Sequence, residues 1–182
     1  LGYYEPSPKA AKEYYAGHVA RRGAELWTYL NMPIEMSDPY GHYRMLAWRS
    51  WKRGMTGTGF WSYGDAGGGS WNRYAVGTLP HYSPMFLGPG TIHDTKHWEA
   101  FREGLEDYER LALLRDRVTE LKTQGQLSPT ATRANRALVD VPAKVLGEEV
   151  GWKMLGWWTP GNRTPADEET KRVLTLLESL AR

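Results

Sequence analysis

The sequence predicts an α/β fold in which parallel strands alternate with helices. Two short apolar and aromatic segments have the composition of strands, and a segment with helical character precedes each of them. A strand, a helix and a second strand in this order normally give parallel pairing through a right-handed crossover. Three further helical segments follow in the second half of the chain.

Proline and glycine mark the ends of the predicted elements in the first part of the chain. The two helices begin at Ser7-Pro8 and Asp38-Pro39, where a capping side chain precedes a proline at the start of the helix. Gly23 and Gly54 follow the two helices and are suited to closing them. The four elements, in the order helix, strand, helix and strand, cover residues 8–22, 24–30, 38–53 and 57–63.

Residues 64–95 show little helical periodicity and interleave aromatic rings with prolines, so a long ring-bearing loop is expected there. The clearest helix runs from Lys96 to about Leu121. Its start is expected at the pair His93-Asp94, acting as a turn and an N-cap rather than as a general base with its orienting carboxylate. The expected apolar stripe of this helix consists of Trp98, Phe101, Leu105, Tyr108 and Ala112.

Two more helices are expected towards the C-terminus. One begins at Ser128-Pro129 and is predicted to be interrupted near Pro142, because proline lacks the amide that an interior helical turn needs. The last begins at Thr164-Pro165 and has an apolar side of Val173, Leu174, Leu177 and Leu180. The predicted organisation is a barrel-type part over residues 1–123 and a helical extension over residues 124–182.

Charge and composition exclude several classes of function. With 23 Lys and Arg against 21 Asp and Glu, the net charge of +2 is too small to indicate a nucleic-acid-binding surface. No apolar run approaches the roughly 20 residues of a membrane helix, so no membrane partner is expected. The absence of cysteine excludes disulfides and thiolate chemistry. No cofactor fingerprint is present, and the compartment stays open between secreted, periplasmic and other locations.

Aromatic residues with a polar atom dominate the composition. The chain has 9 Trp and 11 Tyr but 3 Phe, together with 20 Gly. Trp and Tyr concentrate where an apolar body meets a wet ligand, whereas a core made for packing alone uses Phe and Leu. The composition therefore indicates glycine-supported segments that present aromatic rings.

Three segments in a fixed order suggest a family. They are Tyr43-Arg44-Met45-Leu46-Ala47-Trp48, the strand at residues 57–63, and residues 98–109 with the pattern W-E-x-x-R-x-G-x-E-D-Y-E. This arrangement resembles the C-terminal part of the glycoside hydrolase family 123-like catalytic domain, also called domain of unknown function 4091. The resemblance covers roughly residues 24–118.

The resemblance implies a (β/α)8 barrel, followed here by extra C-terminal helices. The strands at Leu26 and Phe60 would be two of the last barrel strands. Two or three strands cannot close such a barrel, because each would leave an unpaired edge. The missing strands would come from upstream sequence of the same protein or from a second chain, and the polypeptide is expected to be incomplete as an enzyme.

The resemblance also implies a chemistry whose acids lie elsewhere. Family members resemble retaining hexosaminidases in which the 2-acetamido group of the sugar attacks its own anomeric carbon, assisted by an adjacent Asp-Glu pair. The adjacent Asp-Glu pair of this chain, Asp167-Glu168, falls in the first turn of a predicted helix, where acidic residues favour the helix dipole. We therefore assign no catalytic residue, and expect the acids upstream.

The chain can instead supply a wall for binding a saccharide. Functional residues of barrels come from the C-terminal ends of strands and the following loops. An indole or phenol ring can stack on the apolar face of a pyranose, while Asn and Asp bind its hydroxyl and amide groups. The expected binding residues are Tyr29, Asn31, Trp61, Tyr63, Asp65 and Trp71, with Tyr74 in the same loop. For each ring the alternative is packing in the interior.

Other polar and aromatic residues have structural explanations as strong as functional ones. Trp48 and Trp51 are expected to pack in the core, and Arg44 to pair with a carboxylate near a helix start. Arg102 is a substrate-binding candidate, but a surface pair with Glu106, four residues on, explains it as well. A metal site is not expected, because the spacing of His81, His93 and His97 matches no ligand motif.

Three functions remain open at this point. The first is a glycoside hydrolase-like domain acting on an amino sugar or related glycoside, to which this chain contributes the aromatic wall. The second is a non-catalytic carbohydrate-binding or structural barrel. The third is a helical interaction module formed by residues 96–182.

Overall fold

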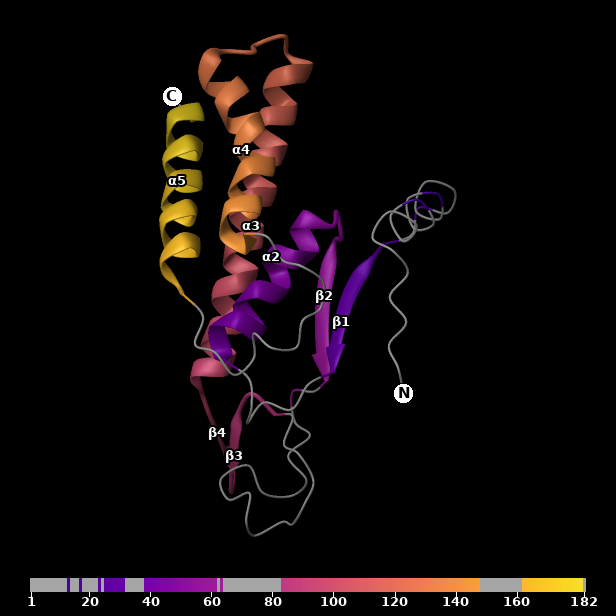
Figure 1. Cartoon of the computed structure of the whole chain (residues 1–182), viewed down its shortest axis with the longest axis vertical. Helices are drawn as coiled ribbons and strands as arrows, with labels where there is room; N and C mark the ends of the chain where they lie inside the picture. The colour runs from indigo at the N-terminus through magenta and orange to yellow at the C-terminus, as the bar shows by residue number, and fades with distance from the viewer. Residues whose placement is uncertain are drawn as a thin grey trace.

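The computed structural model describes residues 25–31, 38–61, 63, 83–147 and 162–181, together with Glu13, Gly17 and Gly23. Within this part the fold is mixed α/β and mostly helical, with a small parallel sheet (Figure 1). The elements are β1 (Trp27–Asn31), η2 (Tyr40–Arg44), α2 (Met45–Lys52), β2 (Gly57–Trp61), β3 (Phe86–Gly88), β4 (Thr91–His93), α3 (Lys96–Thr123), α4 (Pro129–Leu146) and α5 (Thr164–Leu180).

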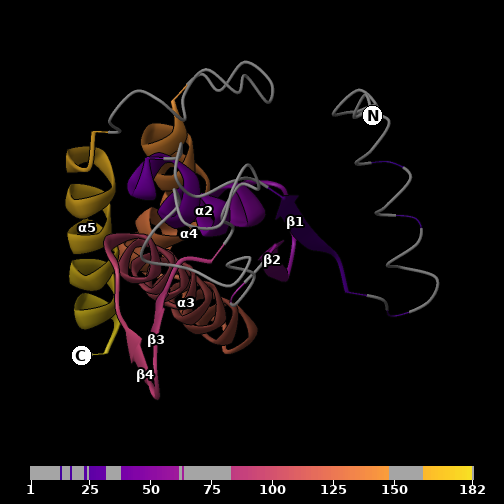
Figure 2. The same cartoon turned by 90° about the horizontal axis from the view of Figure 1, so that it is seen from below.

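The predicted parallel pair of strands is confirmed. β1 and β2 run parallel, with Trp27 opposite Gly57 and Asn31 opposite Trp61, and the helix between them packs against both. The hydroxyl of Thr28 lies 2.7 Å from that of Ser50 on α2, so this face of the sheet is directed towards the helix. Figures 1 and 2 both show the sheet on the side of the molecule opposite α5.

The predicted helix over residues 38–53 is confirmed, but it begins with a π-helical turn. Asp38 accepts a hydrogen bond from the Gly41 amide at 2.5 Å at the start of this turn. Gly54, with a φ of +70°, follows its end, as a glycine after a helix commonly does. Of the first predicted helix, Glu13 and Gly17 are described and both are helical; its other residues lie outside the described part.

The apolar stripe predicted for α3 is displaced. The buried positions are spaced alternately four and three residues apart, whereas Leu105 of the predicted stripe is exposed. This spacing is that of a helix packed against others along its whole length. The buried positions are Ala100, Gly104, Asp107, Leu111, Leu114, Val118 and Leu121. The prediction was wrong at Leu105 and did not allow for a buried glycine and a buried aspartate, whereas Phe101 packs against the core and Tyr108 lies half-buried against Trp51.

The expected interruption at Pro142 was also wrong, since α4 continues through it. A proline in a helix leaves the carbonyl four residues earlier without its amide partner. Here that carbonyl belongs to Leu138, and the indole Nε1 of Trp51 donates to it at 3.1 Å. A side chain from α2 therefore replaces the missing backbone bond, and the helix need not break.

The segment expected to be a loop contains a hairpin. β3 and β4 pair antiparallel around Pro89-Gly90, and Gly90 has a φ of +72°. Proline followed by a glycine with positive φ is the pattern of a type II turn. These two strands were not predicted because each has three residues, too few for alternation to be recognised.

One hydrophobic core joins the C-terminal helices to the rest. Met45 and Trp48 of α2 pack with apolar residues of α3, α4 and α5. Figure 2 shows α3, α4 and α5 together, with α2 between them and the sheet. The core therefore crosses residue 123, and the proposed division there stays a prediction. Among the described helices none is long and apolar enough to cross a lipid bilayer.

The Trp51–Leu138 bond can be tested by a double substitution. Trp51→Phe keeps a ring but removes the donor, and we expect it to lower the free energy of unfolding by about 1 kcal/mol or more. Pro142→Ala restores an amide beneath Leu138, so the cost of Trp51→Phe should shrink in that background. Urea unfolding of the four proteins gives the coupling; additive effects would contradict the proposed replacement of the amide.

Candidate functional site

The C-terminal ends of the parallel strands and the N-terminal ends of several helices meet at one end of the molecule. Figure 1 shows β1 and β2 ending at the lower side of the helical part, where η2, α3 and α5 begin. In α/β folds with parallel strands, ligands bind at this edge. The described residues around it are therefore the first candidates for a functional site.

Three exposed aromatic side chains occupy the face of the sheet turned away from α2. Trp27, Tyr29 and Trp61 are 63%, 60% and 48% exposed. They share this face because they alternate with Thr28 and Phe60 along their strands, and because directly paired residues of parallel strands point the same way. We call Trp27, Tyr29 and Trp61 the aromatic face.

Glycines on the neighbouring strand make room for these rings. Gly57 and Gly59 lie opposite Trp27 and Tyr29. A Cβ atom added at Gly57 would lie 2.5 Å from Cδ2 and Cε2 of Trp27, so any other residue there would displace the indole from this position. A Cβ atom added at Gly59 would lie 3.8 Å from Cδ2 of Tyr29, which is an ordinary van der Waals contact. The indole of Trp27 consequently rests on the backbone of β2.

The expected binding residues are partly brought together. Tyr29, Trp61 and Tyr63 are exposed on or directly after the strands, and Asn31 ends β1 opposite Trp61. The ring of Tyr63 meets that of Trp98 at the start of α3, with centroids 5.3 Å apart. Asp65, Trp71 and Tyr74 lie outside the described residues. Trp27 was not predicted, although its separation of two residues from Tyr29 on a predicted strand was a sufficient signal.

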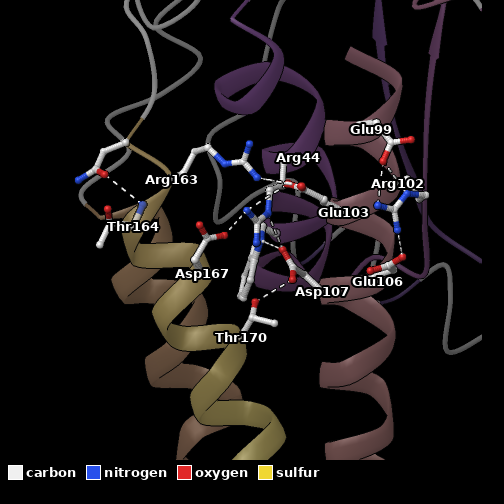
Figure 3. Close-up of polar contacts among 12 residues, drawn as sticks. Arg44, Glu99, Arg102, Glu103, Glu106, Asp107, Arg163, Thr164, Asp167 and Thr170 are labelled. Atoms are coloured by element: carbon white, nitrogen blue, oxygen red, sulfur yellow. Dashed lines mark hydrogen bonds and ion pairs between the residues drawn. The ribbon is translucent and has the colours of Figure 1, made fainter. Parts of the chain in front are cut away.

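Arg102 lies on the exposed surface of α3. Its guanidinium donates to Glu99 at 2.9 Å and to Glu106 on the next turn (Figure 3). These contacts agree with the surface-pair explanation. Such exposed pairs contribute little to stability, and a substrate-binding role for Arg102 stays a prediction.

The dominant polar cluster is built around Arg44, the last residue of the π-helical turn. Its Nε donates to Asp107 at 2.8 Å, and its Nη1 contacts Asp167 at 2.5 Å and Glu103 at 3.2 Å (Figure 3). Arg44 and Asp107 are 4% and 2% exposed. Burial alone would lower the pKa of Arg44, but the two aspartates raise it above its ordinary value. The guanidinium therefore stays charged in the interior.

Asp107 is the acceptor that links four elements. Its Oδ2 also accepts from the indole Nε1 of Trp48 at 3.0 Å, and its Oδ1 accepts from the hydroxyl of Thr170 on α5 at 2.7 Å. Arg110 approaches Oδ1 at 3.3 Å. Both oxygens of this buried carboxylate are thus satisfied, as a buried charge requires. Asp167, expected to favour the dipole of α5, in addition pairs with Arg44 across the helix interface.

Residues 98–109 serve mainly to pack α3 against η2 and the strand–helix–strand unit. A Cβ on Gly104 would lie 2.6 Å from the carbonyl oxygen of Arg44, so glycine lets α3 approach η2 closely. Tyr108 donates to the carbonyl of Met55 at 2.8 Å, just before β2. Gly104, Asp107 and Tyr108 therefore hold α3 against the strand–helix–strand unit.

A second buried polar group lies in the same π-helical turn. His42 is 2% exposed, and burial, with smaller contributions from Arg49 and His97, lowers its pKa to about 4. The imidazole is therefore neutral at neutral pH. The adjacent Tyr43 is fully buried among the rings of Phe60, His97 and Phe101, and burial raises the pKa of its phenol.

The histidines do not assemble into a metal site in the described part, where no group of three or more His, Asp or Glu could hold an ion. His93 is exposed in β4, and His81 lies outside the described residues. The expected N-cap at His93-Asp94 was wrong by one residue: Thr95 caps α3, and its hydroxyl accepts from the Trp98 amide at 3.2 Å.

No protein-family model matches this chain, and no curated protein matches it. The geometry of the described residues is therefore the basis for any statement about function.

Replacing Asp107 should cost far more stability than replacing its exposed neighbour. Asp107→Asn removes the charge that pairs with Arg44. Its amide nitrogen would face either the donors of Arg44 and Trp48 or those of Thr170 and Arg110. Breaking a buried ion pair in this way costs about 3 kcal/mol or more. Glu106→Gln removes two partly exposed ion pairs, with Arg102 and Arg110, and should cost less than about 1 kcal/mol. Equal midpoints for the two variants in urea unfolding would contradict the central role of Asp107.

His42 predicts a pH dependence of stability. Its pKa is lowered in the folded state, so the unfolded chain binds the proton first, and stability falls as the pH drops from about 6.5 towards about 4. Between pH 7 and pH 5 the expected loss from this group is about 2 kcal/mol. Urea unfolding at the two pH values should show a smaller loss in His42→Phe than in the wild type. His93→Gln, at an exposed site, is the control and should keep the wild-type difference.

Proposed function

We propose that this chain forms part of a glycoside hydrolase-like domain that acts on an amino sugar or a related glycoside. The chain contributes a wall of aromatic side chains for the saccharide, and the catalytic acids lie on a segment upstream of it. The observation that carries the proposal is the aromatic face, which leaves three large rings open to solvent on β1 and β2, with Trp61 at the C-terminal end of β2.

Exposed rings at these positions are unfavourable for packing alone. Burying a large apolar side chain stabilises the folded state by about 1.5–3 kcal/mol. The residues of the aromatic face lose much of this stabilisation because they stay exposed. A pyranose offers a C–H surface to one side and hydroxyls to the other, which suits a half-exposed indole or phenol. Asn31 is the last residue of β1 and stands opposite Trp61 in the strand register, and we propose it as a polar partner for the sugar.

The proposed domain also needs a larger parallel sheet, and the pair β1 and β2 supports this part of the proposal. In a (β/α)8 barrel helices cover the outer face of the strands and ligands bind at the C-terminal strand ends; here α2 packs on one face of β1 and β2, and Trp61 ends β2. Within the described residues the sheet has these two strands only. We propose that further parallel strands, from upstream sequence of the same protein or from a second chain, extend it towards a (β/α)8 barrel.

A specific observation favours a second candidate, a non-catalytic carbohydrate-binding or structural barrel domain. The adjacent Asp-Glu pair of the sequence lies at the start of α5, and Asp167 is bound to buried Arg44. That aspartate is occupied in holding helices together rather than directed to a ligand. The two candidates share the aromatic face and differ in whether upstream acids accompany it.

Removing one ring should weaken saccharide binding without unfolding the protein. Trp61→Ala is expected to reduce affinity roughly fivefold to tenfold, in line with the loss of one aromatic contact of about 1 kcal/mol or more. Tryptophan-fluorescence titration with N-acetylglucosamine and its short oligomers measures the effect. Phe86→Ala, at an exposed ring on the β3–β4 hairpin, is the control. Wild-type affinity in Trp61→Ala, in Tyr29→Ala and in Trp71→Ala would reject the aromatic wall.

A further inference from the structure

We propose that Trp98, in the first turn of α3, binds the saccharide together with Tyr63 at the C-terminal edge of the sheet. This inference rests on the proposed saccharide-binding function and adds to it a binding residue on α3. Tyr63 follows the end of β2 by two residues, and α3 begins at the same end of the molecule (Figure 1). In barrels, ligands bind at this edge, on the segments that follow the strands. We call Trp98 and Tyr63 the two-ring corner.

The two rings of this corner stand nearly perpendicular to each other. Their centroids are 5.3 Å apart and their planes meet at 74°. Tyr63 is 46% exposed, and Trp98 is half-buried. In such an edge-to-face pair neither ring is stacked flat on the other, so a sugar can lie against the plane of one ring and touch the other at the same time.

The polar atoms of the two rings are available to a ligand. Within the described part of the chain, no hydrogen bond engages the indole Nε1 of Trp98 or the hydroxyl of Tyr63, and Nε1 of Trp98 is open to solvent. An indole N–H donates a hydrogen bond, and a phenol can both donate and accept. A sugar offers hydroxyls next to its C–H surface, so it can satisfy the plane and the polar atom of one ring together.

The other tryptophans of the helices show the pattern of an indole that only packs. Nε1 of Trp48 donates to Asp107 at 3.0 Å, and Nε1 of Trp51 donates to the carbonyl of Leu138 at 3.1 Å. Both indoles use their N–H inside the protein, as a buried polar group requires. Trp98 differs from them, because its N–H is left for a partner outside the described residues.

The indole of Trp98 is supported from the core. Its ring lies against Phe101, with centroids 5.8 Å apart and planes tilted by 35°, and Phe101 meets Phe60 of β2 at 4.9 Å. Phe60 and Phe101 belong to the packed interior between the sheet and the helices. Trp98 is therefore the outer member of a series of rings that continues into the core.

The backbone of the two-ring corner is held by the segment before the β3–β4 hairpin. The hydroxyl of Ser83 donates to the carbonyl of Tyr63 at 2.7 Å. The hydroxyl of Thr95 accepts from the Trp98 amide at 3.2 Å and donates to the carbonyl of Pro84. Ser83 and Pro84 are buried, so both rings are attached to a fixed base. Such preorganisation favours affinity, because less conformational entropy is lost when the ligand arrives.

The first test measures affinity in matched variants. N-acetylglucosamine and its β-1,4-linked trimer are titrated by calorimetry into the wild type, Trp98→Leu, Tyr63→Leu and Trp61→Ala. Leucine keeps an apolar contact with Phe101 but has no plane, so we expect Trp98→Leu and Tyr63→Leu each to weaken trimer binding roughly fivefold to tenfold. Leu113→Ala, at a 59% exposed site further along α3, is the control and should bind as the wild type.

The second test detects contact directly and needs only the folded wild type. The indole N–H resonance of Trp98 is identified in ¹⁵N-labelled protein as the signal that Trp98→Phe lacks. We expect this resonance to shift as the trimer is added and to saturate at the affinity found by calorimetry. A tryptophan that only packs against Phe101 would keep its resonance position, so the measurement separates binding from packing even if Trp98→Leu fails to fold.

The possible failures are distinguishable. Wild-type trimer affinity in folded Trp98→Leu, or an unshifted Trp98 resonance at saturating trimer, together with weakened binding in Trp61→Ala, would overturn the role of Trp98 and leave the proposed function intact. A shifted Trp98 resonance with wild-type affinity in Trp61→Ala would support the two-ring corner and separate it from the aromatic face. If the wild type binds neither sugar, both proposals fail.

Discussion

The buried ion pair between Arg44 and Asp107 is the interaction on which the arrangement of the helices depends. The two groups are 2.8 Å apart and almost fully excluded from solvent. A charge in such a position is tolerated only when its partners are in place, so the pair requires η2, α2, α3 and α5 to meet in one arrangement. Trp48 and Thr170 complete the coordination of Asp107 from two of these elements. Apolar packing alone would allow the helices to slide, whereas this cluster specifies their register.

The same cluster connects the C-terminal helix to the strand–helix–strand unit. Asp167 and Thr170 of α5 contact Arg44 and Asp107, and Arg163 just before α5 binds Glu103 at 2.8 Å. Further along, Lys144 of α4 pairs with buried Glu169. The first half of α5 is thus attached largely through polar contacts, while Val173 and Leu180 continue the attachment through the apolar core. The aromatic face lies on the other side of the molecule, on a sheet whose position this packing sets.

Element types followed from the sequence where local signals were strong. Proline, glycine and capping residues gave the starts and ends of most helices, and the alternation of helix and strand gave the parallel pairing of β1 and β2. The sequence did not reveal the buried face of α3, because its key positions are Gly104 and Asp107, which periodicity counts as polar or neutral. It also mispredicted Pro142, because the donor that replaces its amide comes from Trp51, far away in the chain. Both errors share a cause: a partner distant in sequence decided the local structure.

In the candidate site, too, local signals were readable from the sequence and contacts between distant residues were not. The positions of Tyr29, Trp61 and Tyr63 on or after predicted strands made them binding candidates, because that inference needs only the direction of the strands. The pairing of Trp27 with Gly57 depends on register between two strands thirty residues apart, which composition does not determine. The structure adds this register, and with it the position of the ring over the glycine.

The π-helical turn at Tyr40–Arg44 has a consequence for how this fold tolerates insertions and deletions. A π-helical turn contains one residue more than an α-helical turn, and each added residue rotates the rest of a helix by about 100° around its axis. Losing that extra residue would rotate Arg44 away from Asp107 or displace Asp38 from the start of the helix. In a family of such chains, this short segment should keep its length even where its side chains vary.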